Sequence, residues 1–271
     1  MTRPYLTATA YRAVRGQLGP RDLSLARHIA ELRFLSGGQL ARLCFAGTTP
    51  RAARHGLLRL TRFGVLDRLP RAIGGVRAGS AGFVYCLGFA GQRLATEQGW
   101  LPERRTRRSL APGTLFVRHA LAVGELHVRL IESERRGNFD LLALDGEPAC
   151  WRTAGSLVLK PDSFVRLGVG DFEHSFFIEV DRATSGSHAI GSQLERYVAY
   201  YASGQEQAEH GVFPRVLWLA PNERRVAVIE GCVGRLADAE RRLFAVALFS
   251  EAIQVISRAA HGSLPAPIPI D

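Results

Sequence analysis

Apolar residues recur at helical spacing in the first part of the chain, and a helix-start signal precedes each run. A first predicted helix begins at Pro20, and its apolar positions are spaced three or four residues apart. Ser36 is placed to cap a second, shorter helix. Thr49 followed by Pro50 predicts a third helix, which ends before Gly64. The pattern therefore predicts three helices in quick succession.

Two short strands are predicted after these helices, at residues 65–69 and 83–87, with a tip rich in glycine and arginine between them. Residues 90–98 predict one more helix. This order resembles a winged helix-turn-helix domain, which would occupy residues 18–99 and place its third helix in the DNA major groove. The residues expected to contact DNA are Arg51, Arg54, His55, Arg59 and Arg62 on the third helix, and Arg71 and Arg77 at the tip.

The second part of the chain alternates short apolar runs with helical patterns, which predicts an α/β sheet domain at residues 115–260. The strands are expected at residues 140–144, 157–159, 163–167, 174–181, 213–219 and 226–229, and a long closing helix at 236–258. Residues 100–114 predict a basic linker, whose arginines either follow a phosphate backbone or form a solvated hinge. Residues 261–271 predict a proline-rich tail.

The charge differs between the two parts. Residues 1–118 contain 20 Arg and 5 Asp or Glu, a net charge of +15, whereas the remainder contains 15 Lys or Arg and 20 Asp or Glu, a net charge of −5. A strongly basic half is typical of proteins that bind a polyanion, most often nucleic acid. One alternative is a general arginine bias, since Lys160 is the only lysine, but that bias does not explain the acidic second half. Another is a solvated helix face in a domain that contacts only protein.

No apolar run approaches the length of a membrane span, and the N-terminus lacks an apolar signal region. The four cysteines are scattered and form no CxxC pair. Thiols in a reducing cytoplasm, with no structural zinc, are therefore expected.

Carboxylates are concentrated on the predicted strand at residues 174–181. Glu179 and Asp181 are two residues apart and therefore share a face of an extended strand. Two ionised carboxylates side by side repel each other unless a cation or a proton intervenes. Hard divalent cations such as Mg²⁺ use this kind of oxygen ligand. Asp162 ends a preceding short apolar run and is a third candidate ligand.

A long helix is predicted at residues 115–136. Glu125 on this helix shares a face with Leu121 and Val128, and a glutamate in line with core positions is unusual unless it is paired or binds a ligand. Glu125 either completes an acidic site on the following sheet or lies at the helix surface near Arg129.

Three short motifs together resemble those of the PD-(D/E)xK nucleases, a restriction-endonuclease-like α/β fold. They are Pro161-Asp162, Glu179-x-Asp181 and Gln193-x-x-x-Tyr197, with the glutamine and tyrosine spaced as in RecB-type nuclease domains. The resemblance implies a Mg²⁺ or Mn²⁺ site held by Asp162, Glu179 and Glu125, and phosphodiester hydrolysis.

The nuclease motif has a lysine at the position of Asp181 in this chain. The resemblance then leaves Asp181 as an additional ligand or as a base for the attacking water. Lys160, in preference to Arg182, would supply the positive charge. Gln193 and Tyr197, one helical turn apart, would fix the water, the carboxylates or the phosphate.

Each of these motifs is also common on its own, so a non-catalytic, degenerate nuclease fold used for dimerisation or strand holding is the alternative. Tyr197, Tyr200 and Tyr201 would also permit a nickase with a tyrosine nucleophile, although tyrosines in an apolar helix are more typical of a core.

The chain as a whole is similar to the replication-relaxation family of actinobacterial plasmids and integrative elements, from about residue 21 to residue 225. The segments that carry the similarity are residues 51–54, 84–85, 119–123, 161–162, 177–184, 196–197 and 213–216. The similarity implies a protein of a plasmid or mobile element that binds double-stranded DNA and nicks or cleaves it in replication, relaxation or transfer. A non-catalytic regulator or replication accessory is the alternative, and a homodimer is an open option.

Overall fold

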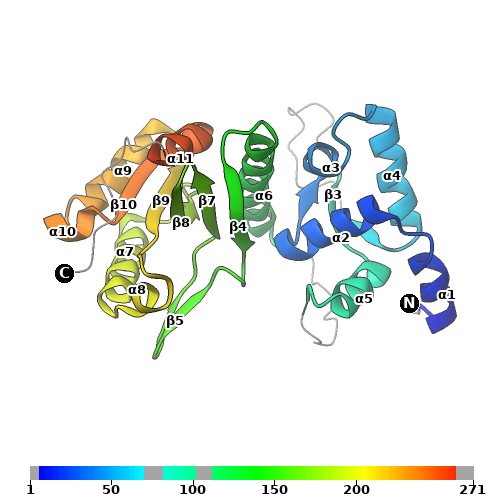
Figure 1. Cartoon of the computed structure of the whole chain (residues 1–271), viewed down its shortest axis with the longest axis horizontal. Helices are drawn as coiled ribbons and strands as arrows, with labels where there is room; N and C mark the ends of the chain where they lie inside the picture. The colour runs from blue at the N-terminus through cyan, green and yellow to red at the C-terminus, as the bar shows by residue number, and fades with distance from the viewer. Residues whose placement is uncertain (1–5, 70–81, 102–111, 261–271) are drawn as a thin grey trace. The chain divides into compact units, whose positions relative to one another are not determined.

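The computed structural model describes residues 6–69, 82–101 and 112–260. The chain divides into two compact units, residues 1–128 and 129–271, and the division falls inside the long helix α6 (Thr114–Arg135). Figure 1 shows the elements of each unit in chain order. The predicted tip arginines Arg71 and Arg77, most of the predicted linker and the whole predicted tail lie outside the described residues.

The first unit contains the three predicted helices, and a small antiparallel sheet with strand order β1-β3-β2. The elements before α6 are α1 (Ala8–Arg15), α2 (Pro20–Leu32), β1 (Leu35–Ser36), α3 (Gly37–Cys44), α4 (Pro50–Arg62), β2 (Leu66–Arg68), β3 (Val84–Leu87) and α5 (Phe89–Glu97). The predicted starts of α2 and α3 and the predictions of α4, both strands and α5 are confirmed to within two residues, whereas α1 and β1 were not predicted.

Local capping explains why these helices start where the sequence indicates. The Ser36 hydroxyl accepts a hydrogen bond from the Gln39 amide at 3.2 Å, and the Gln39 side chain returns to the Ser36 amide at 2.9 Å. Thr49 caps α4 in the same way, through the Ala52 amide at 3.2 Å, and Pro50 follows at the first helical position.

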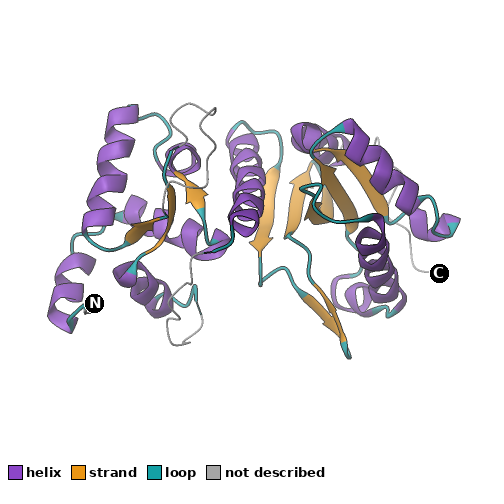
Figure 2. Ribbon diagram, turned by 180° about the vertical axis from the view of Figure 1, so that it is seen from behind, coloured by secondary structure: helices purple, strands orange, loops and turns teal. Residues whose placement is uncertain are grey.

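The second unit is built on a five-stranded mixed sheet with strand order β10-β9-β8-β7-β4. Strands β4 (Asp140–Gly146), β7 (Ser163–Val169) and β8 (Phe172–Val180) are antiparallel neighbours, and β8, β9 (Arg215–Ala220) and β10 (Phe244–Leu248) are parallel. A separate strand pair is formed by β5 (Arg152–Ala154) and β6 (Leu157–Leu159). Figure 2 shows the strands in orange among the covering helices. The protein is thus a mixed α/β protein, as predicted.

The helices α7 (Ser187–Ala202) and α9 (Glu223–Val233) pack on the sheet face that carries Phe177 and Trp218. The remaining helical elements of this unit are α8 (Gln205–His210), α10 (Asp238–Arg241), the 3₁₀ turn η2 (Phe249–Glu251) and α11 (Ala252–Ala260). All five residues from Phe176 to Val180 are buried, because β8 lies in the middle of the sheet. No helix among the described residues is both long enough and apolar enough to cross a membrane.

Two predictions for the C-terminal part were wrong. Residues 226–229 are not a strand but part of α9, which Asn222 caps by accepting a hydrogen bond from the Arg225 amide at 3.0 Å. The predicted helix 236–258 is instead divided into α10, β10, η2 and α11. The reason is tertiary, since the apolar residues of β10 pair along their whole length with β9 and complete the parallel edge of the sheet.

Candidate functional site

The outer face of α4 in the first unit is basic. Arg51, Arg54, His55 and Arg62 are exposed, and the helix contains no acidic residue. Its opposite face, with Ala53, Leu57 and Leu60, is buried. The apolar face fixes the helix on the unit, so the basic side chains are held outwards on a rigid element.

Arg59, the remaining arginine of α4, is paired with an acidic residue of the same unit. Its Nη2 atom lies 2.6 Å from both carboxylate oxygens of Asp22 on α2, and its guanidinium stacks 5.5 Å from the centre of the Phe63 ring. Asp22 is buried. Arg59 therefore joins α4 to α2, and its replacement would disturb the fold as well as any DNA contact.

Glu125 also has a partner in the first unit. Arg42 Nη1 donates to Glu125 Oε1 at 2.6 Å, and Gln39 Nε2 donates to Oε2 at 3.4 Å. This pairing is sufficient to explain why a glutamate is in line with core positions. Within the part of the chain that the structure describes, no group of three His, Cys, Asp or Glu side chains is arranged to hold a metal ion.

The second unit brings together four of the predicted residues at the end of β8. Glu179 Oε1 accepts hydrogen bonds from Tyr197 Oη at 2.5 Å and from Gln193 Nε2 at 3.1 Å, both on α7. Asp162 Oδ2 accepts one from the Val180 amide at 2.7 Å. The spacing of glutamine and tyrosine thus places both side chains on one carboxylate oxygen.

Burial dominates the electrostatics of this cluster. Desolvation raises the pKa of Glu179 well above its usual value, and the neighbouring charge of Asp162 raises it further. Burial, and then the charge of Glu179, raise the pKa of the Tyr197 phenol. Tyr197 is therefore a hydrogen-bond donor to the carboxylate and is poorly suited to act as a nucleophile.

Asp181 follows the last residue of β8, and an arginine binds its carboxylate. Arg225 Nε and Nη2 on α9 donate to the two oxygens at 2.8 and 2.7 Å. Both side chains are almost buried, with 6% of Asp181 and 11% of Arg225 exposed. Arg225 was missed by sequence reasoning, since it lies 44 residues from Asp181 and belongs to no motif.

Lys160 stacks on an aromatic ring. Its Nζ atom lies 4.5 Å from the centre of the Trp151 ring, which is a cation–π geometry. The structure therefore places the Lys160 ammonium against an indole ring, and the carboxylate of Asp181 is paired with Arg225.

Two carboxylates, Asp162 and Glu179, remain as possible metal ligands at this cluster. Magnesium in proteins is often held by only one or two carboxylates together with the phosphate of the substrate. A cation would also offset the repulsion from Asp162, which adds to burial in raising the pKa of Glu179. The donor chemistry of this pair therefore fits a divalent ion.

A family model described as Replication-relaxation matches residues 27–216. The chain belongs to the replication-relaxation family. Comparisons with curated proteins and with solved structures each gave no match. The replication-relaxation match spans α4 and the carboxylates Asp162 and Glu179, whereas Arg225 lies beyond its end. Membership suggests a role in the replication or relaxation of a plasmid or mobile element.

Proposed function

We propose that the protein binds double-stranded DNA through α4 of a winged helix-turn-helix domain, in the replication or relaxation of a plasmid or mobile element. The observation that carries the proposal is the outer face of α4, on which four basic side chains are exposed and acidic residues are absent. Such a face attracts the phosphate backbone and releases counterions on binding. The order of helices and strands in the first unit and the replication-relaxation match support the same proposal.

The test is a double substitution on α4, Arg51→Ala with Arg54→Ala. Both side chains are exposed, so the variant should fold like the wild type. Loss of two phosphate contacts should lower affinity for duplex DNA about tenfold or more, and should reduce the slope of log K against log salt by roughly 1.8. Fluorescence anisotropy with a labelled duplex over a series of NaCl concentrations measures both quantities.

The matched control removes the same charge elsewhere in the first unit, by Arg12→Ala with Arg27→Ala. Both arginines are exposed, on α1 and α2. This control should keep the affinity of the α4 face. Equal affinities of the wild type and the α4 variant at low salt would rule out α4 as the DNA-binding element.

A second candidate function is metal-dependent DNA cleavage by a PD-(D/E)xK nuclease-like domain in the second unit. The cluster of Asp162, Glu179, Gln193 and Tyr197 favours it. Asp162 and Glu179 would hold Mg²⁺ or Mn²⁺, and Gln193 and Tyr197 orient the Glu179 carboxylate. The bound ion would neutralise charge on the scissile phosphate and lower the pKa of the attacking water.

Incubation with supercoiled plasmid and Mg²⁺ or Mn²⁺ tests this second candidate. If the domain is catalytic, the wild type should produce nicked or linear DNA, and Asp162→Asn should produce none while it still binds DNA. If the wild type binds the plasmid but leaves it intact with either ion, the second unit serves the replication-relaxation role without catalysis.

A further inference from the structure

Arg68, the last residue of β2, has a side chain that is held by aromatic rings. Its guanidinium carbon lies 4.3 Å from the centre of the Phe83 ring and 5.6 Å from that of Tyr85. Tyr85 is also the residue directly opposite Arg68 in the antiparallel pairing of β2 and β3. Opposite residues of a strand pair point to the same face, so the stacking follows from the register.

The charge of Arg68 is not neutralised by a carboxylate among the described residues. Its neighbour Asp67 accepts a hydrogen bond from the Arg68 backbone amide at 2.8 Å, but none from the guanidinium. The Nε atom is buried and has no hydrogen-bond partner within the described part of the chain. Of the three Arg68 guanidinium nitrogens, only Nε is both buried and without a hydrogen-bond partner among the described residues.

The rings that hold Arg68 adjoin the helices of the first unit. A methyl group built at Gly37, the first residue of α3, would lie 3.4 Å from the Tyr85 ring and 3.8 Å from Leu57 of α4. Tyr85 is itself buried, with 4% exposed. The ring is therefore packed beside the start of α3, and β2, which carries Arg68, packs directly against α4.

We infer that Arg68 is a further DNA contact, a guanidinium that Phe83 and Tyr85 orient in advance to donate its terminal amino groups to a backbone phosphate. A stacked guanidinium loses less rotational freedom on binding than an exposed lysine or arginine, and its planar fork matches two phosphate oxygens. The inference rests on the proposed DNA binding, and it extends the interface from α4 to the β2–β3 strand pair.

Arg93 on α5 provides a matched control. Its guanidinium also stacks on an aromatic ring, 4.2 Å from the centre of Tyr11, but its Nε atom donates to Glu97 at 3.4 Å. Arg68→Gln and Arg93→Gln thus remove the same charge and the same kind of stacking from one unit. They differ in whether a carboxylate already neutralises the arginine.

The experiment measures duplex-DNA affinity against NaCl concentration for the wild type, Arg68→Gln, Arg68→Lys and Arg93→Gln, with thermal melting of each variant. Arg68→Gln should weaken binding about fivefold to tenfold and reduce the salt slope by about 0.9, the value for one lost phosphate contact. Arg68→Lys keeps the charge and should keep the slope, but it loses the planar stack and part of the affinity. Arg93→Gln should match the wild type.

The same measurements distinguish a failure of the Arg68 inference from a failure of the proposed DNA binding. If Arg68→Gln and Arg68→Lys keep the wild-type affinity and slope while the α4 variant loses them, Arg68 is a structural residue and the inference is overturned. A lower melting temperature of Arg68→Gln with an unchanged salt slope overturns it as well. If the wild type itself does not bind DNA, the proposed function fails, and the inference fails with it.

Discussion

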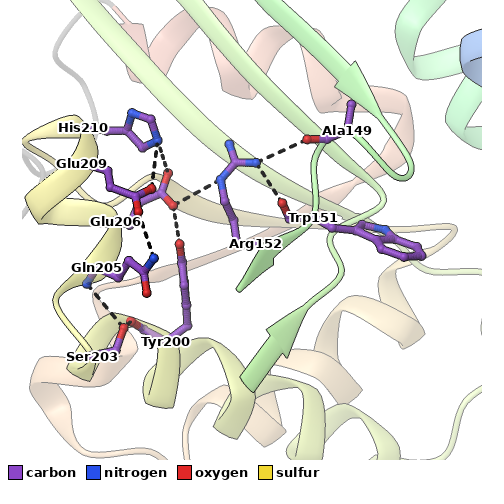
Figure 3. Close-up of polar contacts among 9 residues, drawn as sticks. All are labelled: Ala149, Trp151, Arg152, Tyr200, Ser203, Gln205, Glu206, Glu209 and His210. Carbon is purple, nitrogen blue, oxygen red and sulfur yellow. Dashed lines mark hydrogen bonds and ion pairs between the residues drawn. The ribbon is translucent and has the colours of Figure 1, made fainter. Parts of the chain in front are cut away.

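Replacing Arg152 with methionine should lower the free energy of unfolding of the second unit by about 3–5 kcal/mol. Glu206 on α8 is fully buried, and Arg152 Nε donates to its Oε2 atom at 3.2 Å. The same oxygen accepts a hydrogen bond from Tyr200 at 2.7 Å (Figure 3). Without Arg152, a buried carboxylate loses its strongest cation. Urea titration followed by tryptophan fluorescence measures the change.

Methionine is chosen because the Arg152 side chain also packs on Phe164 and Phe177, with its guanidinium 4.8 and 5.5 Å from the ring centres. The double variant with Glu206→Gln removes the buried charge together with its partner and should recover most of the lost stability. His210 Nε2 also lies near this carboxylate, 3.9 Å from Glu206 Oε1. A single variant within about 1 kcal/mol of the wild type would contradict a structural role of the pair.

The Arg152–Glu206 pair also shows where sequence reasoning ends. The two residues are 54 positions apart, on a short strand and a short helix, and no spacing rule joins them. The same holds for Asp181 and Arg225. By contrast, Gln193 and Tyr197 are one helical turn apart, so helix geometry predicts that their side chains point in the same direction. Only the three-dimensional structure shows that both donate to Glu179.

Some elements of the fold likewise follow from local sequence signals, whereas others depend on pairing with distant residues. The starts of α3 and α4 were predictable, because the capping residues and the groups they bind are three positions apart. The residues of β10 form an apolar run that suits a buried helix or a buried strand equally well. Parallel pairing with β9 decides in favour of the strand, and nothing within the run indicates that partner.

The Glu179→Gln variant should be more stable than the wild type at neutral pH, by a margin that grows with pH. Burial and the charge of Asp162 hold the pKa of Glu179 above its unfolded value of 4.5, so the folded protein keeps this proton while the unfolded chain releases it. Glu179 therefore makes its full contribution to the stability of the wild type below about pH 4.5. This contribution decreases by about 1.4 kcal/mol per pH unit as the pH rises towards the folded pKa. Glutamine accepts the same hydrogen bonds from Tyr197 and Gln193 but has no proton to lose.

The two proteins should have equal stability near pH 4, and their difference at pH 5, 6 and 7, from urea titrations, gives the slope. A difference that does not change with pH would show that Glu179 titrates normally.

Repeating the series with Mg²⁺ then tests the metal-binding role separately from cleavage. A cation held by Asp162 and Glu179 favours the ionised carboxylate, so Mg²⁺ should stabilise the wild type, leave Glu179→Gln nearly unchanged and narrow the margin. If Mg²⁺ has no effect on either protein, the proton rather than a metal ion relieves the repulsion between Glu179 and Asp162, and the second unit has no divalent-ion site there.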